Sequence, residues 1–544
     1  MKLIHFFCLS LALFPMASTF GHDNSPIPLD EVLAPCLKGI LLSSSNDQTI
    51  LNPEMEGVHL EGLNLASDEE SSLITRLCGR LEKPLTLCSI QEIKREIILF
   101  YRDIGRPVVL VLVPEQELSN SVLVIEILES KMGDVEVCGN KWSSDNKYKR
   151  MVRLKCGCPI DANTLVSDLR WINRNPYRNV SALYKSGKCP GTTDVELLVK
   201  DQFPLSVYSG VDNTGFKDVG LQRVFAGLNW GDAFGIDGFL SYQFTASTSP
   251  KEFMSHAGSY TQPLPWRHIF LAYGGYSFVD THLQGRLFKF HGTSIQASGR
   301  YQIPLQVGKD FLQQMGFGVD FKRTNNTVDF GGFTVINHLV NLFQYVAEYT
   351  LTYNPKNTKI YLETELLGSP GRTLGDMSNS LYELLRFDAK NVYLYGRGVF
   401  SIEHKIPRDY SFYLRLTGQG STANLLPSEQ LGLGGYNSVR GYYERQINVD
   451  DGIISNLEFR TCPLSPFCRN NWDFHGLAFA DFAFGQEHKA ASFEKPQYYL
   501  LGVGPGLRFS NDWFLARLDW GIRLLKTQHD GPATRLHFSF IARY

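Results

Sequence analysis

Apolar and polar positions alternate along most of the chain after Asp201. In the run NVYLYGRGVFSIE, Val392, Leu394 and Phe400 occupy one set of alternate positions, and Arg397 lies in the other set. The runs SFYLRLTGQ and WFLARLDWGIRL have the same arrangement, again with arginine on the polar side. A period of two predicts β-strands with one apolar face and one polar face.

The alternating runs recur up to the C-terminus, with glycine or polar residues between them. We count about sixteen runs, and an even number is typical of a single-chain antiparallel transmembrane barrel with lipid outside and a polar lumen. A soluble sandwich, whose apolar faces bury against each other, is the alternative. The runs begin near Phe203, Leu221, Asp237, Phe253, His268, Thr293, Asp310, Val335, Asn357, Asn391, Tyr410, Asp451, His475, Tyr498, Trp513 and Thr534.

The last run, TRLHFSFIARY, has Leu536, Phe538 and Phe540 on one face and ends on Tyr544. A C-terminal strand that closes on an aromatic residue is similar to the assembly signal of bacterial outer-membrane proteins. We therefore expect the barrel assembly machinery to recognise the strand ending at Tyr544, and outer-membrane lipid to surround the barrel.

The first third of the chain mixes strand and helix patterns. After the strand-like run GVHLEGLNL, Ser67 and Glu70 form the expected capping box of a helix. Leu73, Leu77 and Leu81 follow at helical spacing, which gives this helix one apolar face.

A second helix is expected from Ile90 to Ile104, with Gly105 ending it. The strand-like runs RPVVLVLVPEQ and SVLVIEILES complete the first module. The order repeats in the strand GDVEVCGN, the helix DANTLVSDLRWINRNP and the strands YRNVSALYKSG and TTDVELLVKD. The sequence therefore predicts two tandem α+β modules, at residues 36–132 and 133–201, ahead of the barrel.

The N-terminal stretch MKLIHFFCLSLALFPMASTFG, residues 1–21, is typical of a secretory signal peptide: Lys2, an apolar run and then small residues. No later apolar stretch is long enough for a spanning helix, so any membrane span is expected to consist of strands. A short proline-bearing segment, residues 22–35, separates the signal peptide from the first module.

The composition narrows the functional classes. A net charge of −2 gives no electrostatic bias toward nucleic acid, so no nucleic-acid partner is expected. The mean hydropathy of −0.15 is too polar for a helical membrane protein. Aromatic residues at 12% and 48 glycines are typical of a transmembrane barrel. The apolar outer face and the polar inner face of such a barrel together give a modest mean hydropathy.

Ten cysteines are distributed unevenly, with seven of them between Cys36 and Cys189. In an oxidising compartment they can form disulfides, and Cys462 with Cys468 is a candidate pair that would close a small loop. Cys156 and Cys158 are too close for the usual zinc spacing and have no paired histidines nearby, so no metal site is expected.

The run EQLGLGGYNSVRGYYE, residues 429–444, is too rich in glycine for a stable helix and too irregular for a plain strand. Its core, LGLGGYNSVRGY, resembles the VRGY loop of the two-partner secretion transporters (TpsB, haemolysin secretion/activation type), in the superfamily that also holds the BamA assembly factors. The two α+β modules then resemble POTRA domains. YRDIGRPVVLVLVPEQEL, WINRNPYRNV, CPGTTDVELLV and YSGVDNTG are similar to runs of the family and occur in its order, so the resemblance covers about residues 57–544.

The resemblance implies that a loop at residues 429–446 folds from outside into the lumen of the barrel, residues 202–544. Its motif here is Val439, Arg440, Gly441 and Tyr442. The loop glycines Gly432, Gly434 and Gly435, with Gly441, would let the backbone pass through a crowded interior.

In this family the loop arginine meets an aspartate in a Phe-x-Asp-x-Gly run on the inner wall. Phe479 and Asp481 stand at the matching place, with Ala483 where the family has glycine. A guanidinium in a narrow lumen needs a carboxylate partner with fork geometry. A solvated position for Arg440 on an external hairpin is the alternative.

The function implied by the resemblance is a translocation pore in the bacterial outer membrane that secretes, or secretes and activates, a partner exoprotein. The POTRA domains would capture the unfolded client in the periplasm. The alternative is an outer-membrane protein assembly factor of the BamA type; a porin or an adhesin would not need the POTRA pair. The segment 22–35 is too short for the plug helix and linker with which family members often begin.

Nothing in the sequence points to an enzyme. We find neither G-x-S-x-G nor H-E-x-x-H, and no phosphate-binding G-x-x-x-x-G-K-[ST]. No catalytic residue and no cofactor is therefore expected.

Overall fold

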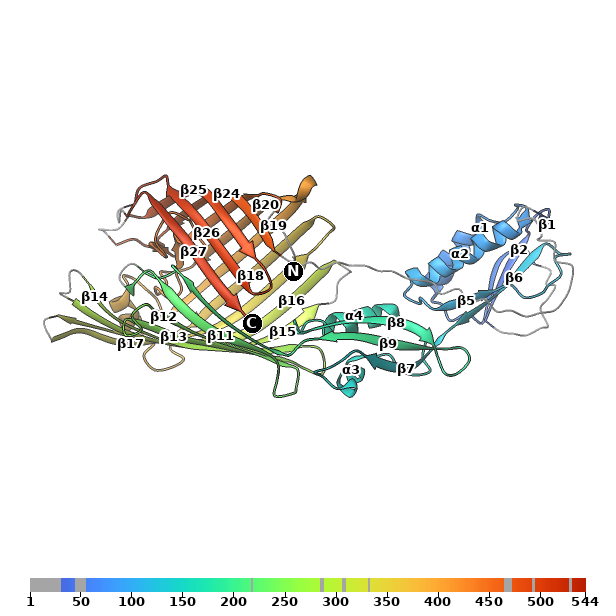
Figure 1. Ribbon diagram of the computed structural model, residues 1–544, viewed down its shortest axis with the longest axis horizontal. Helices are drawn as coiled ribbons and strands as arrows, with labels where there is room; N and C mark the ends of the chain where they lie inside the picture. Colours follow the sequence, from blue (N-terminus) through green and yellow to red (C-terminus); the bar gives the residue numbers. More distant parts are fainter. Residues whose placement is uncertain are drawn as a thin grey trace. The chain divides into compact units, whose positions relative to one another are not determined.

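The chain forms two compact units, drawn in Figure 1. The first unit consists of Met1–Ile172 with Val180–Lys200, and the second of Asn173–Asn179 with Asp201–Tyr544. The predicted signal peptide and most of segment 22–35 lie outside the described residues. The computed structural model describes residues 31–44, 55–216, 219–283, 288–305, 310–330, 333–463, 472–491, 495–527 and 531–544.

The first α+β module is a four-stranded sheet with two helices. The sheet order is β3-β2-β6-β5; β2 is parallel to β3 and β6, and β5 is antiparallel to β6. Leu73, Ile93 and Ile97 of the helices are fully buried in a core with Leu123 and Ile125 of the sheet. The elements are β2 (Gly39–Ser43), β3 (Gly57–Glu61), α1 (Ser67–Cys78), α2 (Leu87–Asp103), β5 (Val109–Leu112) and β6 (Val122–Glu129), with a small pair β1 (Val32–Ala34) and β4 (Leu85–Thr86).

The start of α1 differs from the predicted capping box. The cap residue is Ala66, whose backbone N–H donates to the Glu69 carboxylate at 3.0 Å. The prediction placed the box one residue too late, on Ser67 and Glu70, because the chain already turns into the helix at Ser67. Alanine has no side-chain acceptor, so only the glutamate half of a capping box is available here.

The second module is a three-stranded sheet in the order β7-β9-β8, with β7 parallel to β9. The backbone N–H of Ala162 donates to the Gly105 carbonyl at 2.8 Å and so joins the two modules. The unexpected helix α3 buries Tyr148 fully, and this single anchor explains why its polar sequence gave no helical stripe. The elements are β7 (Lys131–Cys138), α3 (Asp145–Met151), α4 (Ala162–Ile172), β8 (Arg178–Ser186) and β9 (Thr192–Asp201).

The second unit is a closed antiparallel barrel of sixteen strands within the described residues, with β27 pairing back onto β10. This confirms the predicted fold class, and each predicted strand start lies within five residues of an observed one. The strands are β10 (Leu205–Asp212), β11 (Arg223–Ala233), β12 (Gly238–Ser247), β13 (Phe253–Pro263), β14 (Ile269–Leu283), β15 (Phe288–Leu305), β16 (Phe311–Phe330), β17 (Phe333–Tyr353), β18 (Thr358–Pro370), β19 (Val392–Ile406), β20 (Tyr410–Ser421), β23 (Asp451–Arg460), β24 (Asp473–Gln486), β25 (Gln497–Ser510), β26 (Phe514–Arg523) and β27 (Thr534–Arg543).

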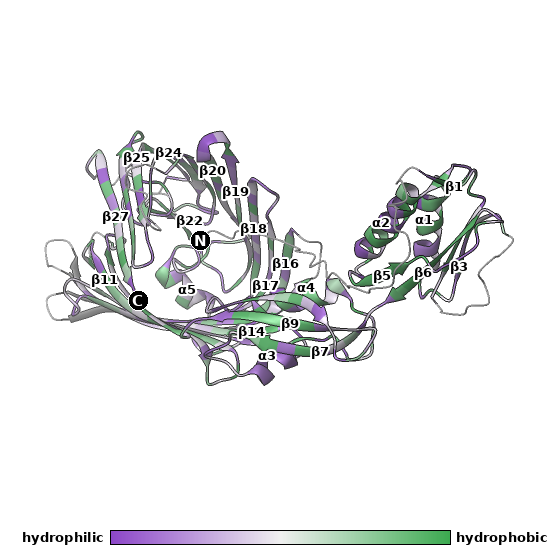
Figure 2. Ribbon diagram, turned by 45° about the vertical axis from the view of Figure 1, so that its right-hand side comes forward, coloured by the Kyte–Doolittle hydropathy of each residue, from purple (hydrophilic) through white to green (hydrophobic). Residues whose placement is uncertain are grey.

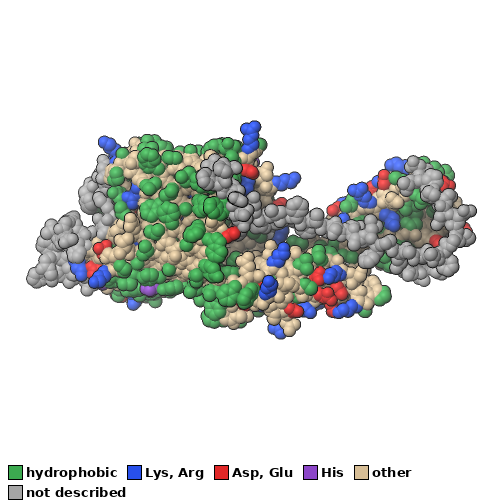
Figure 3. All heavy atoms as spheres, in the orientation of Figure 1, with side chains coloured by type: hydrophobic (Ala, Val, Ile, Leu, Met, Phe, Trp, Pro, Cys, Tyr) green, Lys and Arg blue, Asp and Glu red, His purple; other side chains and the backbone are tan. Residues whose placement is uncertain are grey.

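The two faces of the barrel wall differ as the alternation predicts. Trp520 is 54% exposed on β26, whereas the neighbouring Asp519 is fully buried. Hydrophobic side chains cover much of the outer face in view (Figure 3). An apolar exterior over a polar interior is the arrangement of a membrane-spanning barrel. None of the helices in the described part of the chain is both long and apolar enough to cross a membrane.

The connections β18–β19 and β20–β23 fold inside the barrel rather than outside it. They carry α5 (Asn379–Leu385) and the hairpin β21 (Leu431–Leu433) with β22 (Ile447–Val449), both within the ring of strands in Figure 2. Leu433 and Val439 of the second connection are fully buried against Ala483 and Leu500 of the wall. A methyl group therefore fits at Ala483, where the family pattern has glycine.

Candidate functional site

Arg440 is the centre of the inward-folded loop and is one of the largest fully buried side chains. Its Nε and Nη2 donate to the two carboxylate oxygens of Asp481 on β24, at 2.7 and 2.8 Å. Its backbone N–H adds a third bond to the same carboxylate at 3.0 Å. Such two-pronged, charge-assisted pairing fixes orientation as well as position.

The two neighbours of Asp481 complete the seat of the guanidinium. The Arg440 Cζ lies 3.6 Å from the ring centre of Phe479, so the cation stacks on the aromatic face. Asn456 of β23 donates to Asp481 at 2.9 Å and to the Ser438 carbonyl at 2.6 Å. The wall therefore holds both the arginine and the backbone just before it.

Two further carboxylates face Arg440, and the sequence did not single them out. Nη1 donates to Glu458 on β23 at 2.8 Å and lies 3.5 Å from Asp519 on β26. Asp519 in turn accepts from Arg508 and Arg517. The result is a buried network of alternating charges, in which each carboxylate has at least one cation.

The backbone of the loop passes unusually close to the wall at Gly441. This residue has φ of +99°, and its N–H donates to His537 Nε2 on β27 at 3.1 Å. A Cβ at Gly521 would overlap the Gly441 nitrogen, and one at Gly502 would overlap the Arg440 carbonyl oxygen. Glycines on the wall, as well as in the loop, therefore allow this approach.

The other predicted loop residues take distinct positions. Tyr442 is buried, and its hydroxyl donates to the Leu525 carbonyl at 2.7 Å. Gly434 and Gly435 have φ of +96° and +110°, which favour glycine, whereas Gly432 lies within β21.

A second set of contacts anchors the base of the loop. Glu429 is buried and accepts from Lys322 of β16 at 2.8 Å, from Gln344 and from Tyr395. Arg386, which follows α5, makes two 2.6 Å bonds to the buried carboxylate of Asp450. The two inward-folded connections are therefore joined to each other as well as to the wall.

The site offers no obvious chemistry of bond making or breaking. Its groups are paired guanidinium and carboxylate side chains, and no group of three potential metal ligands occurs in the described residues. Eight described cysteines are free thiols, Cys462 among them; Cys468, its candidate partner, lies outside the described residues. What the arrangement can do is hold a loop across the lumen.

Comparisons with known proteins identify the family. The model of the haemolysin secretion/activation protein ShlB/FhaC/HecB matches residues 191–509, more than half of the chain. The chain belongs to this family. The membership confirms the resemblance inferred from the sequence, and with it the function of an outer-membrane transporter of two-partner secretion.

Curated relatives of the family are similar over most of their length. The heme/hemopexin transporter protein HuxB of Haemophilus influenzae strain 86-028NP is 23% identical over 467 residues, 82% of this chain and 79% of the relative. The outer membrane transporter CdiB of Dickeya dadantii is 23% identical over 401 residues, 69% of this chain and 66% of that protein. The predicted outer-membrane location agrees with these relatives.

Solved structures support the fold. CdiB from Escherichia coli superimposes with a TM-score of 0.76 at 16% identity, over 96% of this chain and 93% of that one. BamA from Haemophilus ducreyi, lacking POTRA domains 1–3, gives a TM-score of 0.52 at 13% identity, over 88% of this chain and 98% of its own. The assembly-factor alternative is therefore the less supported one.

Proposed function

We propose that the barrel carries an extended exoprotein across the outer membrane, past the inward-folded loop at residues 429–446, whose seating on the wall shapes this path. Residues 36–132 and 133–201 are proposed to be the first and second POTRA domains, in the periplasm. The observation that carries the proposal is the buried ion pair between Arg440 and Asp481, which seats the loop inside a closed barrel.

The loop is held strongly but reversibly in this proposal. A buried ion pair is costly to break singly, because each partner would be left without its counter-charge. A client that moves the whole loop into water would rehydrate Arg440. The carboxylates keep other cations nearby, since Arg460 donates to Glu458 and Arg517 to Asp519. Glu458 and Asp519 would therefore keep a counter-charge when the loop leaves, whereas Asp481 would keep only its hydrogen bond from the Asn456 amide.

Capture of the client would use the edge strands of the POTRA sheets. In the first module β5 lies at the edge, and Leu110 on it is 54% exposed. An extended client can add a strand to such an edge through main-chain hydrogen bonds, which recognise conformation more than sequence. The transporter would then select its client by the client's unfolded, extended conformation rather than by a sequence tag.

The partners follow from this role. The client is an exoprotein, and the name of HuxB makes a haem- or hemopexin-related exoprotein the first candidate class to test. Lipid surrounds the apolar exterior. The barrel assembly machinery is proposed to recognise the last strand, whose Tyr544 is 82% exposed and whose backbone pairs with Val207 of β10. We assign transport and no catalytic step to the protein.

The test compares the proteins of the medium and the outer membrane in cells with and without this transporter. Loss of one large exoprotein from the medium, with the outer-membrane barrels unchanged, is the expected result. Loss of many barrels from the membrane would instead identify an assembly factor. An unchanged set of exported proteins would contradict the secretion proposal.

A further inference from the structure

The inner wall of the barrel is uneven in charge. The segments Gly238–Ser247, Phe253–Pro263 and 269–279, which are β12, β13 and most of β14, contain no Lys, Arg, Asp or Glu. The remaining wall carries the charged network around Arg440 and further pairs such as Arg300 with Asp320 at 2.8 Å. One part of the lumen wall, formed by these three strands, therefore carries no Lys, Arg, Asp or Glu side chain.

The strand register identifies which residues of the uncharged strands face the lumen. Lys322 binds Glu429 of the inward loop, so it faces inward, and directly opposite partners in antiparallel strands share a face. Following the directly opposed partners across four strand pairings identifies one inward residue on each strand. The series is Lys322, Gln296, Gly275, Ala257 and Gln243.

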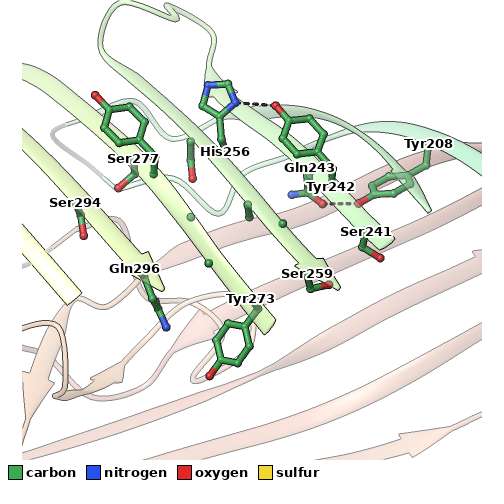
Figure 4. Close-up of a pocket in the computed structure, with 16 residues that line it drawn as sticks. Tyr208, Ser241, Tyr242, Gln243, His256, Ser259, Tyr273, Ser277, Ser294 and Gln296 are labelled. Carbon is green, nitrogen blue, oxygen red and sulfur yellow. Dashed lines mark hydrogen bonds between the residues drawn. The ribbon is translucent and has the colours of Figure 1, made fainter. Parts of the chain in front are cut away.

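We call the eight inward residues of these strands that line one hollow the hydroxyl wall: Ser241, Gln243, Ser255, Ala257, Ser259, Tyr273, Gly275 and Ser277. A hollow of about 460 Å³ lies against it and includes Ser294 and Gln296 of β15. Figure 4 shows Ser259, Tyr273 and Gln296 on one side of the sheet and His256 on the other. Small side chains leave this hollow, while hydroxyl and amide groups keep it polar.

The inward-folded loop is attached elsewhere. Its base at Glu429 is bonded to β16, β17 and β19. Its tip at Arg440 is bonded to β23 and β24, and Gly441 to β27. None of these partners lies on the hydroxyl wall, so the loop and the wall occupy different sides of the lumen.

We propose that the hydroxyl wall is the track along which the extended exoprotein slides through the barrel. This inference rests on the proposed secretion function. A neutral hydrogen bond is weak once the exchange with water is counted, so a peptide chain can exchange such bonds one by one as it moves. Charged walls would hold client side chains of opposite sign, and passage requires binding that is weak enough to release.

The absence of charge also suits a client of mixed sequence. A moving chain presents positive, negative and apolar side chains in turn, and the hydroxyl wall repels or traps none of them by charge. Backbone N–H and C=O groups, which every residue of the client carries, are the groups that serine and glutamine side chains can bind. Recognition would therefore be of the extended backbone, as at the POTRA edges.

The test places a photo-crosslinking amino acid at one inner position at a time in the full-length transporter. The positions on the hydroxyl wall are Ser259 and Ser277. Ser401 is the matched serine on the charged side, since it lies six residues from Tyr395 on β19 and shares its inward face. Tyr276, which adjoins the inward Gly275 on β14 and is exposed, represents the lipid face. The probe is the exoprotein whose export is lost without the transporter, arrested in transit by a fused disulfide-stabilised domain. A parallel assay measures its export in the variants Ser259→Asp with Ser277→Asp, and in Ser401→Asp.

Crosslinks at Ser259 and Ser277 should exceed those at Ser401 several-fold, and Tyr276 should give none. The paired aspartates should slow export several-fold with unchanged barrel in the membrane, and Ser401→Asp should not. Equal or stronger crosslinking at Ser401, or normal export with both aspartates, would overturn the track while leaving secretion intact. If deletion of the transporter removes no exoprotein, the secretion function itself fails, and the track with it.

Discussion

Glu458 Oε1 accepts a 2.8 Å hydrogen bond from Arg440 Nη1 on the side of the guanidinium that Asp481 leaves free. The two carboxylates belong to neighbouring strands, β23 and β24, so one side chain of the loop ties two strands together. Both carboxylates are buried, and without the arginine each would lose a direct counter-charge. The loop and the wall are therefore electrostatically dependent on each other.

Replacing Arg440 with alanine should impair secretion far more than membrane insertion. Breaking one partner out of a buried pair costs about 3–5 kcal/mol, which is enough to unseat the loop. The amount of exoprotein in the medium reports secretion, and heat-modifiable migration in gels reports the folded barrel. Arg372→Ala, at an exposed position, is the control. Equal loss of secretion and of folded barrel would make Arg440 a folding residue.

Exchanging the charges, with Arg440→Asp and Asp481→Arg, should not restore secretion. An aspartate at 440 is shorter than arginine and would also face Glu458 and Asp519, which carry the same sign. Arg440→Lys should retain part of the activity, because it keeps the charge but loses the fork geometry. Secretion assays on the single and double variants measure both effects. Full rescue by the exchange would show that the Asp481 pair acts alone.

An alanine at Gly521 should unseat the loop without touching any charge. Its Cβ would overlap the Gly441 nitrogen, and overpacking of this kind costs about 1–3 kcal/mol. The secretion defect should resemble that of Arg440→Ala. Gly420→Ala is the matched control, since a Cβ there meets only open space. Normal secretion in Gly521→Ala would mean that the loop does not need this close approach.

Arg386→Ala should loosen the α5 connection and, through Asp450, the base of the loop. The arginine bonds both Asp450 and Glu487 and also the Leu425 carbonyl, so its removal takes away the guanidinium that faces the buried Asp450 carboxylate. Protease added outside intact cells should then cut the β18–β19 connection faster than in the parent, whereas Arg372→Ala should not change the rate. An unchanged cleavage pattern would argue against a joint anchor.

The thiol of Cys138 in the second module should be slow to alkylate. It donates to Glu196 at 3.2 Å, and this hydrogen bond raises the pKa of the Cys138 thiol above its ordinary value. A raised pKa means less thiolate at a given pH, and the thiolate is the reactive form. Iodoacetamide rates measured against pH should have their midpoint shifted downward by Glu196→Ala. Cys189 in the same sample provides the labelling reference, and an unmoved midpoint would contradict the role of Glu196.

The alternating pattern was sufficient to predict the strands of the barrel. Every second side chain faces lipid and must be apolar, so each strand is visible in the sequence as an alternation of apolar and polar residues. The same alternation placed Phe479 and Asp481 on one face of their strand. The short helix α3 was not predicted, because it buries only one side chain, Tyr148, and so has no periodic apolar pattern. The predicted position of the capping box was wrong by one residue, because several acidic residues in succession can each serve as the partner of a helix cap.

The sequence by itself determined the barrel, the two modules before it and, through the family resemblance, the loop arginine with its aspartate. Only the tertiary structure decided that Glu458 and Asp519 complete the seat of Arg440, and that Gly502 and Gly521 make room for the loop. In a strand pattern these residues are simply members of a polar face or small residues within it. They become a site when closure of the barrel and the inward fold bring distant strands around one guanidinium.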